Sequence, residues 1–166
     1  MGGSEESKSR WEGETSIEVE GMSAEQVWPL LEDFCSIHKW LPIETCFQVE
    51  GTYGQPGLIR YCAMNMNTAD DEPTLMWAKE KLLHIDPIQR SLIYEVVDSN
   101  MGFNSYVATI QVFPVPKPTT CKIQWSFVCH PMEMFTFEAF FSLIRSFIHS
   151  MAKNMELAAS SHDKSA

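Results

Sequence analysis

The spacing of apolar residues changes once along this sequence, and that change limits the possible folds more than any other feature. Between residues 45 and 130, apolar and polar residues alternate in short runs that are typical of strands. Clusters of Gly, Pro, Asp and Asn separate these runs and are typical of tight turns. We therefore predict six strands, at about 45–51, 57–66, 74–86, 90–98, 103–113 and 119–130. Because the turns are short, the strands should form an antiparallel meander.

The spacing then lengthens over Glu133–Leu157, where apolar residues recur three, four and seven positions apart. This pattern predicts one long helix that could cover a curved sheet. Upstream, Trp11–Gly21 alternates like a strand and brings the predicted total to seven. Ser23 and Gln26 form a capping box for a first short helix, and a second helical piece follows at Cys35–Trp40. The expected fold class is α+β.

The composition fits a single domain. The chain has 166 residues, of which 45% are hydrophobic, which is enough to bury one core. We place the domain at residues 11–157. Residues 1–10 and 158–166 are polar, and we expect them to be disordered tails.

Charge and hydropathy exclude several function classes. A formal net charge of −10 argues against binding to nucleic acid or to an anionic membrane surface. No segment approaches the roughly 18 consecutive apolar residues of a membrane span, so we expect no membrane insertion. The N-terminus also lacks the apolar core of a secretory signal. A cytoplasmic protein is therefore expected.

The five cysteines are odd in number and form no CxxC pair, a pattern that suits a reducing compartment. Neither the cysteines nor the histidines occur at metal-ligand spacings. We therefore expect no disulfide, no metal and no other cofactor. No pattern in the sequence sets the oligomeric state, and a monomer or weak dimer is expected.

Two charged residues interrupt the apolar faces of neighbouring predicted strands. Successive strand residues point to opposite faces, so Arg60 and Glu80 each share a face with apolar residues. Those apolar residues are Leu58, Cys62, Met64, Met66, Met76, Ala78 and Leu82. A buried ion pair seldom offsets its desolvation, which makes Arg60 and Glu80 candidate site residues. Two alternatives stay open: an ordinary ion pair at the sheet edge, and a register shifted by one residue.

Three aromatic residues on later strands, Tyr94, Tyr106 and Trp125, also share faces with apolar residues. We regard them as candidates for the lining of a pocket. Aromatic residues at such positions also form ordinary core, and this alternative stays open.

The chain resembles the birch-pollen-allergen and START-like superfamily, also labelled polyketide cyclase/dehydrase or SRPBCC. Within that superfamily it looks like the plant lachrymatory-factor-synthase branch. The similar segments are RWEGE (10–14), EQVWPLLEDFCSIHKWLP (25–42), VEGTYGQPGLIRY (49–61), WAKEKL (77–82), YVATIQV (106–112) and WSFVC (125–129). The resemblance implies the helix-grip fold, in which a seven-stranded antiparallel sheet wraps around a long C-terminal helix and encloses a hydrophobic cavity.

The resemblance also implies an activity, the conversion of an alk-1-enyl sulfenic acid into a thial S-oxide without metal or coenzyme. The essential arginine and glutamate of that branch correspond to Arg60 and Glu80. Glu80 would move the proton, because burial favours its neutral form while a neighbouring arginine favours its ionised form. Arg60 and Tyr106 would hold the sulfenyl oxygen. The expected ligand-binding residues are Tyr94, Trp125, Met64 and Phe147.

Two other function classes remain open at this point. The cavity could carry a small hydrophobic or amphipathic plant metabolite, lipid or hormone without catalysis. A structural or partner-binding protein would instead have a filled core. A cavity of roughly 300 Å³ or more would indicate a ligand.

Overall fold

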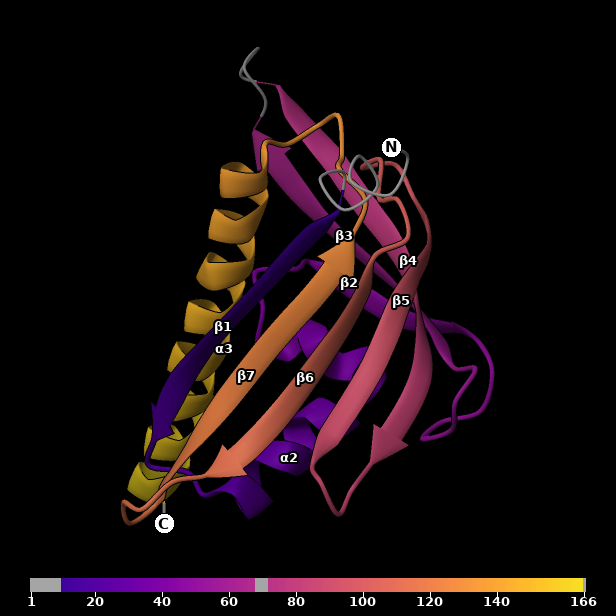
Figure 1. Ribbon diagram of the computed structural model, residues 1–166. Helices are drawn as coiled ribbons and strands as arrows, with labels where there is room; N and C mark the ends of the chain where they lie inside the picture. Colours follow the sequence, from indigo (N-terminus) through magenta and orange to yellow (C-terminus); the bar gives the residue numbers. More distant parts are fainter. Residues whose placement is uncertain (1–9, 68–71, 166) are drawn as a thin grey trace.

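The computed structural model describes residues 10–67 and 72–165, and it contains one antiparallel sheet with a long helix against it (Figure 1). The seven strands lie in the order β1-β7-β6-β5-β4-β3-β2. Their bounds are β1 Trp11–Glu20, β2 Thr45–Glu50, β3 Ile59–Asn67, β4 Pro73–Asp86, β5 Ser91–Ser99, β6 Val107–Pro114 and β7 Thr120–Cys129. The helices are α2 Ala24–Glu32, the 3-10 helix η1 Phe34–Lys39, and α3 Phe137–Ser165. This is the helix-grip α+β architecture that the sequence predicts.

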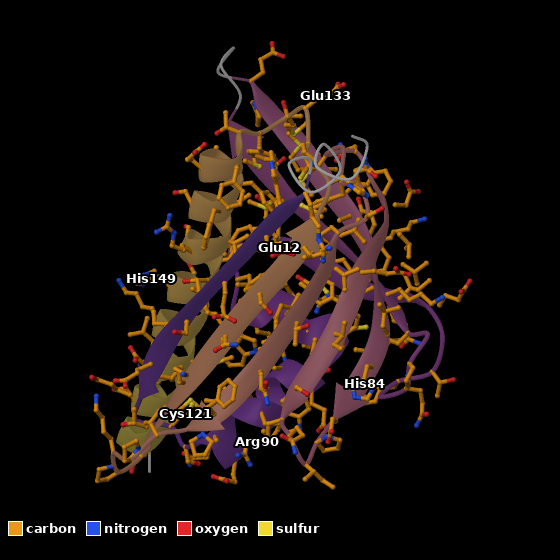
Figure 2. All side chains as sticks on the ribbon, in the orientation of Figure 1. Glu12, His84, Arg90, Cys121, Glu133 and His149 are labelled. Carbon is orange, nitrogen blue, oxygen red and sulfur yellow. The ribbon has the colours of Figure 1, made fainter. Side chains whose placement is uncertain are left out.

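The helices cover different parts of the sheet. α3 packs against β1 and β7 and runs along that edge of the sheet (Figure 1). α2 contacts β6 and β7, whereas η1 contacts β2 and β3 at the other edge. Ile148 of α3 is buried, while its neighbour His149 is exposed and points away from the sheet (Figure 2). No helix in the described part of the chain is both long and apolar enough to cross a membrane.

The predicted capping box is present at the start of α2. The backbone N–H of Gln26 donates to Ser23 Oγ at 3.3 Å, and the backbone N–H of Ser23 donates to Gln26 Oε1 at 2.9 Å. Two otherwise unsatisfied amides of the first turn are therefore paired. The helix begins where the sequence predicts because this cap is a local interaction.

Some element bounds differ from the predictions. β6 begins at Val107 and not at residue 103, because Ser105 has a φ of 55°, a left-handed conformation that interrupts a strand. α3 begins at Phe137 and not at Glu133, because Thr136 caps it: the Ala139 amide donates to Thr136 Oγ1 at 3.1 Å.

The C-terminal bound of the long helix also differs from its prediction. The helix continues to Ser165, whereas the sequence predicted its end at Leu157. Two alanines after Leu157 are strong helix formers, and neither Gly nor Pro follows them, so the helix can propagate. Of the predicted N-terminal tail, residues 1–9 lie outside the described residues.

The core lies between the inner face of the sheet and the helices. Val19, Ile123, Ile148, Met151 and Met155 are among its most buried members. Within the described part of the chain, Arg60 is the one charged residue in this buried set, with 4% of its surface exposed.

Candidate functional site

A cavity lies between the inner face of the sheet and the helices η1 and α3. The seven site residues predicted from the sequence all line it: Arg60, Met64, Glu80, Tyr94, Tyr106, Trp125 and Phe147. Six of them lie on five elements, β3, β4, β5, β7 and α3, and Tyr106 directly precedes β6, so the fold brings together residues that are far apart in the sequence. Whether they catalyse or bind remains a prediction.

The cavity is small. Its walls leave about 750 Å³ unfilled when the opening to solvent is included, but only about 70 Å³ is open to the centre of a water molecule. One water molecule takes roughly 10–15 Å³ on the second measure, so about five to seven water molecules would fill the space. A compact organic molecule therefore fits, but the space is well below the roughly 300 Å³ that we set as the indication of a ligand cavity.

Strand register places the two charged residues together. β3 and β4 pair so that Arg60 lies directly opposite Glu80, and both residues line the cavity. Arg60 Nε donates to Glu80 Oε1 at 2.8 Å, and Arg60 Nη2 lies 2.8 Å from the same oxygen. The Glu80 side chain is 15% exposed. The pair therefore belongs to the cavity wall and not to the outer face of the sheet.

Further contacts hold the Arg60 guanidinium in place. Its Nη1 donates to the backbone carbonyl of Phe34 at 2.7 Å. Its central carbon lies 3.8 Å from the centroid of the Phe34 ring and 5.0 Å from that of Tyr94. Burial alone would lower the pKa of Arg60, but the Glu80 carboxylate raises it, so the guanidinium stays charged. Contacts with Glu80, Phe34 and Tyr94 therefore fix the orientation of the Arg60 guanidinium.

The second carboxylate oxygen of Glu80, Oε2, has fewer hydrogen-bond partners than Oε1. No residue in the described ranges 10–67 and 72–165 donates a hydrogen bond to Glu80 Oε2. An ionised carboxylate offers two oxygens with about four acceptor positions. Glu80 therefore retains an acceptor for a molecule in the cavity.

Tyr106 supplies a hydroxyl to the same cavity. Trp125 Nε1 donates to Tyr106 Oη at 3.2 Å, and the Tyr94 hydroxyl is a second neighbour that affects the pKa of Tyr106. Burial raises the pKa of Tyr106, so its hydroxyl keeps its proton. Since an indole N–H can only donate, Tyr106 accepts from Trp125, and its own proton can be donated either to Tyr94 or to a ligand.

Several parts of the site were not predicted. The Phe34 carbonyl that binds Arg60 is a backbone group, and no residue pattern indicates it. Loop residues Met101, Phe103 and Phe135 also line the cavity. Cys62 lines it as well and contacts Cys46, with 3.6 Å between the two sulfurs. The predicted face of β3 did include Cys62, but its partner depends on the pairing of β2 with β3.

Over the described residues, no group of three or more His, Cys, Asp or Glu side chains has an arrangement that could hold a metal ion. The polar side-chain groups that line the cavity include the carboxylate, guanidinium, hydroxyl and thiol groups described above.

The comparisons with known proteins agree with this architecture. Residues 10–156 match the family model described as "Polyketide cyclase / dehydrase and lipid transport". The solved structure of the protein XoxI from Bacillus cereus has a TM-score of 0.71 and 25% identity, over 92% of this chain and 97% of that one. An uncharacterized protein from Bacillus thuringiensis has a TM-score of 0.67 and 25% identity, over 90% and 98%.

A plant structure shows the same fold. Major latex-like protein 151 from Panax ginseng has a TM-score of 0.66 and 19% identity, over 91% of this chain and 98% of that one. At that identity the likeness concerns the fold alone.

Proposed function

Because this chain belongs to the polyketide cyclase/dehydrase and lipid transport family, we propose that it is a cofactor-independent isomerase or dehydratase. Its substrate would be a compact organic molecule with a polar head, held in the cavity. The family and fold by themselves support a ligand-binding or isomerase role in general. The specific activity is inferred from the cavity.

The observation that supports catalysis is the pairing of a carboxylate oxygen and a hydroxyl in one small apolar cavity. Glu80 Oε2 has no donor among the described residues, and the Tyr106 hydroxyl has a proton that it can donate to a substrate. A proton transfer needs an acceptor and a hydrogen-bond donor that stabilises the charge which develops on the substrate. Glu80 would be the acid and base, and Tyr106 would hold the substrate oxygen.

Arg60 has a different role in this proposal from the one expected from the sequence. Its Nε and Nη2 contact Glu80, and its Nη1 contacts the Phe34 carbonyl. These contacts favour a positioning role, in which Arg60 orients Glu80 Oε2 toward the substrate. Substrate contact by Arg60 is limited to its remaining N–H groups.

The size of the cavity favours a substrate of few atoms, and the sulfenic acid of the lachrymatory-factor-synthase reaction is of this size. In that reaction Glu80 takes the proton from the S–O–H group and returns it to the distal alkenyl carbon. The C=C bond is lost, a C=S bond forms, and no atom enters or leaves. A plant cytoplasm is part of this proposal, because five thiols suit a reducing compartment.

The second candidate is a carrier without catalytic activity. The extensive contacts of Arg60 with the protein favour it, because a guanidinium held in this way also makes a rigid wall. A cavity of this size argues against a lipid or hormone and favours a compact metabolite as cargo.

Turnover of a defined substrate distinguishes the two candidates. An alk-1-enyl sulfenic acid is generated in situ beside the purified chain, and the thial S-oxide is measured by gas chromatography with mass spectrometry. The isomerase proposal expects product above the rate without protein, and a strong loss of product with Glu80→Gln. Equal product formation with and without the folded protein would contradict this substrate. Binding of the thial S-oxide without turnover would support the carrier.

A further inference from the structure

Two cysteines lie side by side next to the cavity. Cys46 on β2 is directly opposite Cys62 on β3, and their sulfurs are 3.6 Å apart. Cys62 is 7% exposed and lines the cavity, with its sulfur 3.9 Å from Glu80 Oε1. Cys46 is half-buried on the edge strand of the sheet. One sulfur is therefore near the surface and the other is next to the proposed catalytic carboxylate.

The surroundings of the two thiols differ in charge. The hydrogen bond donated by Cys62 lowers the pKa of Cys46 to about 6; Arg60 and His38 lower it further, while burial opposes them. The same hydrogen bond and burial raise the pKa of Cys62. These effects favour the thiolate at Cys46 and the thiol at Cys62. Nearby Cys35 is not activated in this way, because burial raises its pKa.

We propose that Cys46 and Cys62 form a redox-sensitive site, at which hydrogen peroxide converts the two thiols into a cross-strand disulfide. The Cys46 thiolate attacks one peroxide oxygen, the O–O bond breaks, and the leaving hydroxide takes up a proton to form water. The Cys46 sulfur is oxidised to a sulfenic acid and the peroxide is reduced. The Cys62 sulfur then attacks the Cys46 sulfur, the S–O bond breaks, and the departing hydroxide leaves as water with the Cys62 proton.

The geometry of the strands permits this bond. Directly opposite residues of an antiparallel pair have Cα atoms about 4.5–5.5 Å apart, within the range of disulfides. The sulfurs must approach from 3.6 Å to about 2 Å, a movement that side-chain rotation and a small shift of an edge strand can supply.

Oxidation would also alter the cavity. The disulfide removes the negative charge of Cys46 near Arg60 and the S–H group of Cys62 near Glu80. Both changes act on the Arg60–Glu80 pair, so the oxidation state of the cysteines is coupled to the site. The proposal itself does not depend on the activity of that site.

The test treats the full chain at pH 7 with an equimolar amount of hydrogen peroxide, blocks the remaining thiols by alkylation, and maps the peptides by mass spectrometry. We expect a linked Cys46–Cys62 peptide. With Cys62→Ser the reaction should stop at a Cys46 sulfenic acid, which dimedone traps. With Cys46→Ser, Cys62 should stay reduced.

Cys121 provides the matched control, because it lies near the start of β7, which β6, β5 and β4 separate from β3 and β2 in the sheet. Burial raises the pKa of Cys121 to about 11. The larger thiolate fraction of Cys46, partly offset by its lower intrinsic nucleophilicity, should make it react more than about tenfold faster than Cys121. Cys121→Ser should leave the linked peptide unchanged. Oxidation of Cys121 at an equal rate, linkage of Cys46 to Cys35, or two reduced thiols after treatment would each overturn the proposal.

Discussion

Arg60 and Glu80 lie opposite each other on β3 and β4, and two nitrogens of the guanidinium contact one carboxylate oxygen, Oε1, each at 2.8 Å. The other oxygen, Oε2, receives no hydrogen bond from the residues that the structure describes. This asymmetry separates the role of Glu80 in the ion pair from its role toward a ligand. It makes the two residues separately testable.

Glu80→Gln should reduce turnover of the sulfenic acid by roughly 100-fold or more, because an amide cannot act as the acid and base. Product affinity should change much less, since the shape of the side chain is kept. Steady-state kinetics and product titration measure the two effects, with a melting curve to establish folding. The matched control is Glu95→Gln on the outer face of β5, which should leave the rate unchanged. An unaltered rate in folded Glu80→Gln would exclude Glu80 as the proton carrier.

Arg60→Met should lower the free energy of unfolding by about 3–5 kcal/mol, because it leaves the largely buried Glu80 carboxylate without a partner. The double variant Arg60→Met, Glu80→Gln should regain a large part of this loss, since no charge then remains. Urea unfolding of the four proteins forms the complete cycle. A loss below about 1 kcal/mol in Arg60→Met would mean that the pair behaves like an exposed ion pair.

Tyr106→Phe removes the hydroxyl that accepts from Trp125 Nε1 at 3.2 Å. A buried donor without a partner costs about 1–3 kcal/mol of stability, and the ligand also loses its hydrogen bond. We expect a lower melting temperature and weaker binding of a polar-headed ligand. Tyr61→Phe is the control, because Tyr61 stacks between Phe47 and Trp77 and does not line the cavity. Equal ligand affinity in Tyr106→Phe and the parent chain would argue against ligand contact.

Phe147→Ala should enlarge the cavity, because Phe147 lines it and stacks on Trp125 with 6.3 Å between ring centroids. The loss of stability should be up to about 3 kcal/mol, since the ring is only half-buried. Straight-chain alcohols of increasing length are titrated and followed by NMR. The longest alcohol that binds to Phe147→Ala should be longer than the longest that binds to the parent chain. Phe141→Ala, on the same helix but outside the cavity, should leave the length limit unchanged. An equal limit on alcohol length in Phe147→Ala and Phe141→Ala would mean that the ligand binds outside this cavity.

The reactivity of Cys46 should depend on pH in a way that reflects its surroundings. With a pKa of about 6, its thiolate predominates above pH 6 and disappears below it. Alkylation by iodoacetamide should therefore rise with pH and reach half its maximum near pH 6. The groups that lower this pKa are Cys62, Arg60 and His38, whereas burial raises it. A midpoint near 8.5, as for an ordinary thiol, would contradict the charge environment described for Cys46.

Local sequence patterns determined much of the fold. The alternation along residues 45–130 indicates which side chains share a face, because strand geometry repeats every two residues. Arg60 and Glu80 could therefore be placed on the inner face before the structure was known. The Ser23 cap of α2 was equally predictable, since its hydrogen bonds join residues three positions apart. Boundaries such as the start of α3 at Phe137 were less predictable, because one capping threonine outweighs the apolar spacing.

Tertiary structure decided what these inner faces enclose. The size of the cavity depends on how closely α3 and η1 approach the sheet, and no periodicity along the chain contains that distance. The Phe34 carbonyl reaches Arg60, and Trp125 reaches Tyr106, only after distant segments have packed. The Cys46–Cys62 contact likewise requires the β2–β3 register, which includes a shift between Gln48 and Glu50. Sequence thus determined the direction of each side chain, which is a local property, whereas packing decided which side chains meet, which is a long-range one.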